Sequence, residues 1–232
     1  MTSEDTTDRD PTGTDTTGTE ATGEDTTRGG ATGKDAPRSS YHHGGLRQAV
    51  LAAALDVIAA DGPGALSLRD LARRAGVSHA APAHHFKDRT GLLTAVAAQG
   101  YELLAEALAA TADLRERGVR YVRFAVEHPA HFQVMFQPEL LRADDPALLA
   151  AKERSSAELR AGVGTLTDVP DARAAGIAAW SLAHGFATLL LTHNVTGAVG
   201  DRDPEEYFRA LTGLLFTGQL PPEKPEKRET RE

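Results

Sequence analysis

Residues 66–86, with the sequence LSLRDLARRAGVSHAAPAHHF, constrain the fold more than any other part of the chain. A helix of about two turns is expected after Ser67, whose hydroxyl can cap it, with Asp70 as its capping-box partner. Gly76 lies where that helix must end and turn, and a second short helix is expected over 79–85. Two short helices joined by a three-residue turn containing glycine have the spacing of a helix-turn-helix, whose second helix lies in the major groove of DNA.

An ordinary pair of helices in a bundle would show the same local pattern, so the flanking segments matter. Residues 41–60, YHHGGLRQAVLAAALDVIAA, have the apolar spacing of an amphipathic helix and are followed by the breaker string DGPG. After the second short helix, KDRTGLL opens another helix. From Tyr41 to Leu93 the chain resembles the DNA-binding domain of TetR-family transcriptional regulators, which carry S/T-L-R-D-L-A-x-x-A-G-V-S, Y-x-H-F and K-D-K-x-x-L-L in this order. The resemblance implies a helix-turn-helix domain, which we place at 41–90.

The distribution of charge bears on a nucleic-acid partner. The 232 residues carry a net charge of −8, but residues 1–40 hold nine acidic and four basic residues, whereas 41–90 hold six basic and four acidic ones. The segment with the helix-turn-helix is thus the only net positive one. Because affinity for DNA grows with the number of phosphates neutralised, so small a positive charge predicts modest attraction unless two copies act together. A homodimer is therefore expected.

Composition also limits the compartment. Cysteine is absent, which excludes disulfides and thiolate metal sites and suits a reducing interior. No apolar run approaches the roughly 18 residues of a membrane span. The longest, around 180–191, is interrupted by His184, and the N-terminus lacks the apolar core of a signal peptide. These features predict a soluble cytoplasmic protein without a membrane partner.

Both ends of the chain have the composition of polar tails. Residues 1–40 repeat Thr, Asp and Gly with almost no large apolar side chain, so we expect them to be disordered. This acidic tail either only solvates the protein or screens the DNA-binding face by competing for its basic residues. Residues 219–232 form a second polar tail.

The sequence between the tails is helical in its periodicity, without a convincing strand pattern. Capping residues mark two helix starts, at Asp144-Asp145 before Pro146 and at Asp203. We predict an all-α protein in which a larger helical domain, 91–218, follows the helix-turn-helix domain. About nine helices are expected: 41–60, the two short helices of the helix-turn-helix, 91–110, 114–127, 130–136, 146–162, 171–194 and 204–216.

The resemblance also indicates which residues meet DNA. Ser78 would cap the second short helix, here called the reading helix, and its first turn would offer histidine for base edges or phosphates and alanine for a thymine methyl. Residues before the first helix, at the start of the second and after the reading helix would contact the DNA backbone. The expected DNA-contacting set is Tyr41, His42, His43, Ser67, Arg69, Ser78, His79, Ala80, Ala81, His84 and Lys87.

Two residues of the reading helix differ from those expected in a helix that binds DNA tightly. Ala83 stands where the family has the tyrosine of Y-x-H-F, which usually contacts a phosphate, and His84 can substitute only in part. Pro82, at about the fourth helical position, removes only the first intrahelical hydrogen bond. The inventory predicts weak base readout with some dependence on DNA shape.

The C-terminal half resembles one TetR subgroup with a W-x-x-x-H-G signature. The string AWSLAHGF carries that signature, and HPAHFQVMF and the YHHGGLR start look like the same subgroup. Trp180 and His184 are four residues apart and share a helix face. They either pack in the core, with the histidine bonded to a backbone carbonyl, or line an effector pocket for a small molecule. In the second interpretation the pocket residues are Phe132, Met135, Phe136, Trp180 and His184.

The helix expected over 171–194 is rich in small residues, so another helix can approach it closely. Together with 204–216 it resembles the helix pair that forms the dimer in the family. A two-fold dimer would space two reading helices about one DNA turn apart and would bind a roughly palindromic operator.

Signals for catalysis are weak. His128 with His131, or His184 with His193, lacks a carboxylate that would complete a metal site, and the chain has no phosphate-binding glycine loop or nucleophile elbow. We expect no enzyme activity, no metal and no cofactor. The chain is interpreted as a ligand-responsive, dimeric repressor of transcription that a small molecule releases from double-stranded DNA. The alternative is a helical small-molecule-binding or scaffold protein whose helix-turn-helix binds DNA only weakly.

Overall fold

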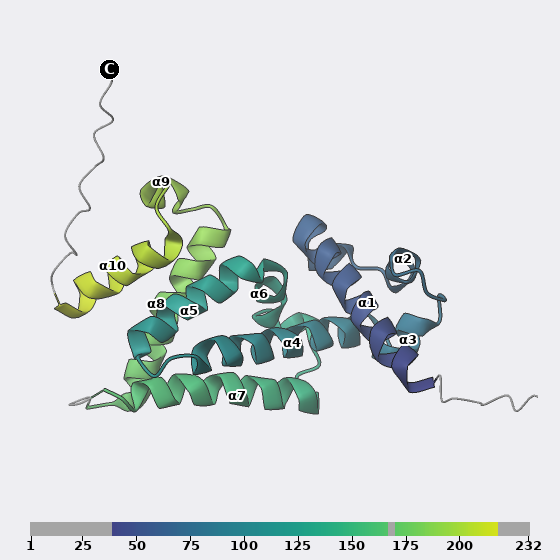
Figure 1. Ribbon diagram of the computed structural model, residues 1–232, viewed down its shortest axis with the longest axis horizontal. Coiled ribbons are helices and arrows are strands. Elements are labelled where there is room, and N and C mark those ends of the chain that lie inside the picture. Colours follow the sequence, from purple (N-terminus) through teal and green to yellow (C-terminus); the bar gives the residue numbers. More distant parts are fainter. Residues whose placement is uncertain (1–38, 167–169, 218–232) are drawn as a thin grey trace, which may run out of the picture. The chain divides into compact units, whose positions relative to one another are not determined.

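The computed structural model describes residues 39–166 and 170–217 (Figure 1). These residues form α-helices and short 3₁₀-helices and no strand, so the predicted all-α fold is confirmed. The disorder predicted for 1–40 and the polar tail predicted at 219–232 fall outside the described residues, apart from the first two residues of α1. The elements are α1 (Ser39–Asp61), η1 (Pro63–Ala65), α2 (Leu68–Arg74), α3 (Ala81–Phe86), α4 (Arg89–Ala109), α5 (Leu114–Glu127), α6 (Pro129–Met135), η2 (Pro138–Leu140), α7 (Pro146–Val163), α8 (Ala172–Leu191), α9 (Thr196–Val199) and α10 (Pro204–Thr217).

Helices α1, α2 and α3 pack on one another around an apolar core. The turn after α2 requires glycine, because Gly76 has a φ of +65°. There the Gly76 N–H donates to the Arg73 carbonyl (3.2 Å) and the Val77 N–H to the Ala72 carbonyl (2.9 Å), the two bonds of a Schellman motif. The buried side chains of the three helices include Val50, Ala54, Val57, Ile58, Leu71 and Phe86.

The other helices pack around α4. Helix α4 runs beside α7 and also contacts α5 and α6, and α5 in turn packs on α8 and α10 (Figure 1). Aspartates begin five of these helices, because their side chains accept a hydrogen bond from a backbone N–H of the first turn. The predicted start at Asp145 before Pro146 is confirmed. The predicted start at Asp203 is confirmed as well, because its side chain accepts from the Glu205 N–H (2.8 Å). The five aspartates are Asp88, Asp113, Asp145, Asp171 and Asp203.

The capping box predicted for α2 is not formed. Ser67 is the N-cap residue but makes no side-chain hydrogen bond to the helix. The Asp70 carboxylate instead accepts from Arg73 (2.5 Å) and Arg74 (2.6 Å), which lie three and four residues further along the same helix face. The hydrogen bond from Arg74 lowers the pKa of Asp70 most, followed by that from Arg73. Asp70 therefore offsets the charge of these two arginines rather than closing the helix.

The helix predicted to extend to residue 194 ends at Leu191. His193 adopts a φ of +60°, and the Asn194 N–H donates to the Leu189 carbonyl (2.9 Å), so a Schellman motif ends the helix three residues early. This helix end was not predictable from the sequence, because His193 rather than a glycine occupies the left-handed position. The short α9 that follows was not predicted.

Helix α8 also corrects the expectation about membrane spans. Among the described residues, α8 is the helix that is long and apolar enough, by length and composition alone, to cross a bilayer. The neutral His184 does not interrupt its apolar character. Only 17% of its apolar window is buried within the chain. Helix α8 thus leaves much apolar surface uncovered, including Ile177, Trp180 and Leu189.

Candidate DNA-binding surface and ligand cavity

The reading helix, α3, begins later than expected. Its N-cap residue is Ala80 rather than Ser78, although the Ser78 carbonyl still accepts a hydrogen bond from the Ala81 N–H (3.0 Å) in the preceding turn. Pro82 therefore stands in the first helical turn instead of at the fourth position. Proline is well tolerated there because backbone N–H groups of the first turn have no intrahelical acceptor.

The predicted DNA-contacting residues that the structure describes lie on an accessible surface. Ala81 is half-buried, and the others are exposed: Ser67, Arg69, Ser78, His79, Ala80, His84 and Lys87. Tyr41, His42 and His43 belong to α1, and their side chains lie outside the described part of the structure. Ala83 is exposed as well, at the place of the family's tyrosine. The DNA contacts themselves stay predictions.

Lys87 follows α3 in a strained backbone conformation, with φ +69° and ψ −59°. The Asp88 N–H donates to the Phe86 carbonyl (2.9 Å) across it, which makes a γ-turn of the rare positive-φ form. The carbonyl of Phe86 then lies against α4 at Gly91, where a Cβ would come within 2.0 Å of that oxygen. Glycine at 91 is what allows the reading helix and α4 to join so closely.

The start of α4 is also tied to the segment between α6 and α7. One oxygen of Asp88 accepts from the Gly91 N–H (2.8 Å) and the other from the Arg142 guanidinium (2.7 Å). The backbone N–H of Arg142 donates to the Thr94 hydroxyl (3.0 Å). The bond from Gly91 is the largest of the causes that lower the pKa of Asp88. The residue next to Lys87 is therefore held by the larger helical region.

A cavity of about 660 Å³ lies among α4, α5, α7, α8 and α10. This volume is within the range of small-molecule binding sites in proteins. Its wall is mostly apolar, and its charged residues are Asp113, Arg115, Arg117 and Lys152. Prominent lining residues are Tyr101, Leu104, Leu108, Tyr121, Phe136, Leu159, Trp180 and Phe208.

The structure brings the five predicted pocket residues together only in part. Phe136 and Trp180 line the cavity. Phe132 and His184 are not among its lining residues, although both rings contact Phe136, with centroids 5.1 and 4.5 Å from it. Met135 is buried against α4, where a Cβ on Gly100 would approach its sulfur to 2.6 Å. The apolar spacing of this segment cannot separate cavity wall from core.

The hydrogen-bond partner of His184 is a side chain and not a backbone carbonyl. Its Nδ1 lies 2.9 Å from the Tyr121 hydroxyl. Burial lowers the pKa of His184 and raises the pKa of the Tyr121 phenol, so a protonated phenol donates to a neutral imidazole. Trp180 is 42% exposed and so does not simply fill the core. Trp180 lines the cavity directly, and Tyr121 connects His184 to it.

Several lining residues escaped prediction, above all Arg117, Tyr101 and Lys152. Arg117 sits in α5 with only 7% of its surface exposed, and its Nη1 donates to the backbone carbonyl and to the carboxylate of Glu158 on α7. The Tyr101 hydroxyl donates to the Met135 carbonyl (2.9 Å), and the Lys152 ammonium lies 5.5 Å over the Tyr101 ring. One signal was present in the sequence: α5 is strongly amphipathic, and Arg117 falls among its apolar positions.

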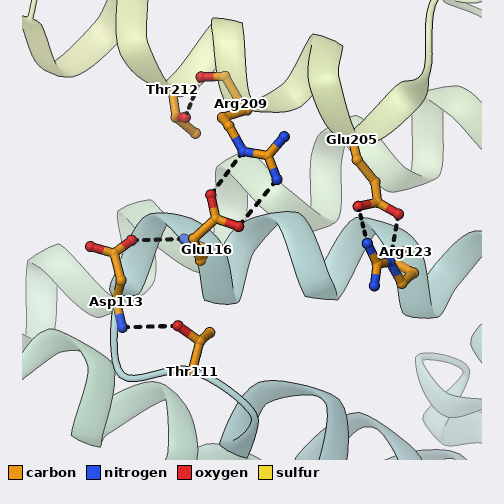
Figure 2. Close-up of polar contacts among 7 residues, drawn as sticks. All are labelled: Thr111, Asp113, Glu116, Arg123, Glu205, Arg209 and Thr212. Atoms are coloured by element: carbon orange, nitrogen blue, oxygen red, sulfur yellow. Dashed lines mark hydrogen bonds and ion pairs between the residues drawn. The ribbon is translucent and has the colours of Figure 1, made fainter.

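Helix α10 closes the cavity with Phe208 and Thr212 and is fastened to α5 (Figure 2). Arg209 bonds both carboxylate oxygens of Glu116 (2.8 and 3.1 Å), and Arg123 bonds both of Glu205 (2.5 Å each). The hydrogen bond from Arg209 is the main cause that lowers the pKa of Glu116. Two ion pairs at successive points thus hold α10 along the surface of α5.

Comparisons with known proteins agree with these features. A family model described as bacterial regulatory proteins of the tetR family matches residues 50–96, and one described as a tetracyclin repressor-like C-terminal domain matches 114–215. Together they include α2, α3 and most of the cavity wall. The chain belongs to the TetR family. It is therefore a DNA-binding regulator of transcription, and the subgroup with the W-x-x-x-H-G signature stays a prediction.

Solved structures of bacterial proteins, two of them described as TetR-family regulators, share the fold. A protein of unknown function from Rhodococcus sp. RHA1 is 31% identical, with a TM-score of 0.64 over 79% of this chain and 100% of that one. The TetR family transcriptional regulator PfmR from Thermus thermophilus is 25% identical, with a TM-score of 0.52 over 75% and 96%. A regulatory protein in the tetR family from Rhodococcus RHA1 is 24% identical, with a TM-score of 0.57 over 73% and 94%. A comparison with curated proteins found no match.

Among the described residues, no group of three or more His, Cys, Asp or Glu side chains is arranged to hold a metal ion. The chemistry that the two regions offer is an accessible surface with polar and basic side chains at α3 and a mostly apolar cavity with a few charged residues in its wall.

Proposed function

We propose that this protein is a dimeric, ligand-responsive repressor, released from a roughly palindromic operator when a small molecule enters the cavity. The observation that carries the proposal is the position of α4. Its first turn adjoins the reading helix at Gly91, and its second half lines the cavity through Tyr101, Leu104 and Leu108. One helix thus contacts both regions, so a ligand that favours a different position of α4 would also move the reading helix.

The dimer is supported by the uncovered apolar surface of α8 and α10. Ile177, Trp180 and Leu189 of α8 and Leu214 of α10 are each more than 40% exposed. Exposed apolar surface of this extent is typical of an interface. A second copy of the same helices would cover it, and the paired reading helices would provide the phosphate contacts that one weakly basic domain lacks.

The test of DNA binding uses the DNA that flanks the protein's own gene, with affinity measured by fluorescence anisotropy from about 50 to about 300 mM salt. We expect tight binding with a steep salt dependence. His79→Ala and Lys87→Ala should weaken it, and Lys87→Ala should also lower the salt slope by about one per protomer. Arg154→Ala, which removes an exposed charge on α7, is the matched control and should leave the slope unchanged. Salt-insensitive or absent binding to every fragment would instead favour the small-molecule-binding or scaffold alternative.

A further inference from the structure

We propose that the ligand of the cavity is an amphipathic monocarboxylate, anchored by Arg117. The inference rests on the proposed function in one respect, that the cavity is the effector site, and it adds the chemical class of the effector. Three observations carry it: a buried guanidinium Nε–H without a partner, the charge around the cavity and the apolar wall.

The first observation is the hydrogen bonding of Arg117. Its Nη1 is used by Glu158, whereas its Nε is buried and has no hydrogen-bond partner. Because Nε–H and Nη2 form one edge of the planar guanidinium, this is the edge that a carboxylate grips with two parallel hydrogen bonds. A buried donor without a partner destabilises the protein, and pairing it with a ligand removes that penalty.

The sequence makes room for this arginine. A Cβ on Gly162 of α7 would lie 2.7 Å from Arg117 Cδ and 3.2 Å from its Nε, so only glycine accommodates the side chain in its observed place. The internal partner is a single carboxylate, Glu158, at 2.9 Å. Arg117 is therefore held in place by Gly162 and Glu158 and lines the cavity with an Nε–H that has no hydrogen-bond partner.

The second observation is the charge of the wall. The charged lining residues are three bases, Arg115, Arg117 and Lys152, and one acid, Asp113. Including Glu158, which pairs with Arg117, the surroundings keep a net charge of about +1. The third observation is that most of the remaining wall is aliphatic or aromatic, and the hydroxyls of Tyr101, Ser155 and Thr212 already donate to backbone carbonyls. One negative charge on an apolar body matches the net charge of about +1 around this wall, whereas the two charges of a dianion exceed it.

The test uses Trp180, the only tryptophan of the chain, which lines the cavity and reports binding through its fluorescence. The purified full chain is titrated with decanoate below its micelle concentration, and with decan-1-ol, decylammonium and decyl phosphate of equal chain length. We expect decanoate to bind about ten- to a hundredfold more tightly than decan-1-ol, as charge-assisted pairing predicts. Equal or tighter binding of the alcohol, the amine or the phosphate ester overturns the inference, as does the absence of any change with decanoate.

Variants locate the effect. Arg117→Met should remove the preference for decanoate while leaving decan-1-ol affinity within about threefold, and Arg160→Met, at an exposed ion pair of α7, should change neither. Glu158→Gln should tighten decanoate binding several-fold, because Arg117 loses its internal anion. A purely structural Arg117 would give no tightening. If Arg117→Met fails to fold by circular dichroism, the Glu158→Gln result decides.

Operator binding separates this inference from the proposed function. Decanoate binding that depends on Arg117 but leaves DNA affinity unchanged would support the ligand class and overturn the ligand response. Conversely, a ligand-responsive repressor that binds only the uncharged probe would retain the proposed function and overturn the carboxylate.

Discussion

Lys87 combines a strained backbone with a predicted phosphate contact. Strain of this kind persists only where the surroundings impose it, and here the close approach of the Phe86 carbonyl to α4 at Gly91 does so. A glycine at 87 would adopt the same γ-turn without a Cβ penalty but would lose the charge.

Relief of the strain and loss of the charge predict opposite outcomes of Lys87→Gly for stability and for DNA affinity. We expect the free energy of unfolding to rise by about 1 kcal/mol while DNA affinity falls and the salt slope decreases. Lys87→Ala is the control, because it removes the charge and keeps the strain. Urea unfolding and anisotropy titrations check both, and equal stability of the two variants would contradict the role of strain.

His131 is a second residue whose environment sets a measurable property. It is 5% exposed, its Nε2 lies 3.3 Å from the Gln99 side-chain oxygen, and burial lowers its pKa to about 4, with a smaller contribution from His128. In the unfolded chain a histidine titrates near pH 6.5. Between these values the unfolded state binds more protons, so stability must fall as the pH decreases.

We therefore predict that the free energy of unfolding falls by about 3 kcal/mol between about pH 7 and about pH 4 on account of His131. His131→Gln should show a flatter dependence over this window, whatever its stability at neutral pH. The lowered pKa values of Asp70, Asp88 and Glu116 also make the free energy of unfolding fall as the pH decreases. Their effect is confined to pH values near and below the ordinary carboxylate pKa of about 4, so it leaves the upper part of the window unaffected. Parallel pH profiles of the wild type and the variant would refute the assignment.

At the scale of elements, α10 is attached to α5 by apolar packing and by ion pairs, and we expect the packing to contribute more to the free energy of unfolding. Phe208 is 1% exposed and approaches α5 so closely that a Cβ on Gly118 would lie 2.9 Å from its ring. Arg209 and Glu116 are both substantially exposed, which limits the contribution of their pair (Figure 2).

Phe208→Ala should accordingly lower the free energy of unfolding by about 3 kcal/mol, whereas Arg209→Gln should lower it by less than about 1 kcal/mol. Arg160→Gln, at the exposed pair with Glu153 within α7, is the control for loss of a surface ion pair. Urea unfolding at one protein concentration compares the three, since subunit association would otherwise shift the midpoints. A loss for Arg209→Gln as large as that for Phe208→Ala would show that the ion pairs dominate.

At the scale of the whole molecule, the uncovered surface of α8 predicts the assembly. The double substitution Ile177→Glu, Leu189→Glu should convert the dimer to a monomer in analytical ultracentrifugation and reduce operator affinity at least about tenfold, because one reading helix alone neutralises few phosphates. Val126→Glu, Leu149→Glu, at similarly exposed apolar positions of α5 and α7, is the matched control and should stay dimeric. A dimer that survives the first pair and not the second would place the interface elsewhere.

Much of the helical layout followed from the sequence because its causes are local. Aspartates accept hydrogen bonds from the helix turn that they precede, and glycine at 76 permits the left-handed turn that ends α2. Apolar spacing marks the face of each helix that packs. Prediction failed where a second local interaction was available. Asp70 pairs with arginines of its own helix instead of forming the capping box, and His193 adopts the left-handed conformation that usually requires glycine.

By itself, the sequence determined the all-α class, the helix-turn-helix and the exposed candidates for DNA contact, since a few neighbouring residues decide each of these. Only the tertiary structure decided which apolar residues line a cavity and which fill the core. Phe136 and Met135 are adjacent in sequence, yet one lines the cavity and the other is buried on α4. The same holds for Arg117, whose position and buried, unpartnered Nε–H depend on Gly162 and Glu158, both far along the chain on α7. Cavity walls and buried charges are set by contacts between distant helices, and one helix's periodicity carries no information about its neighbours.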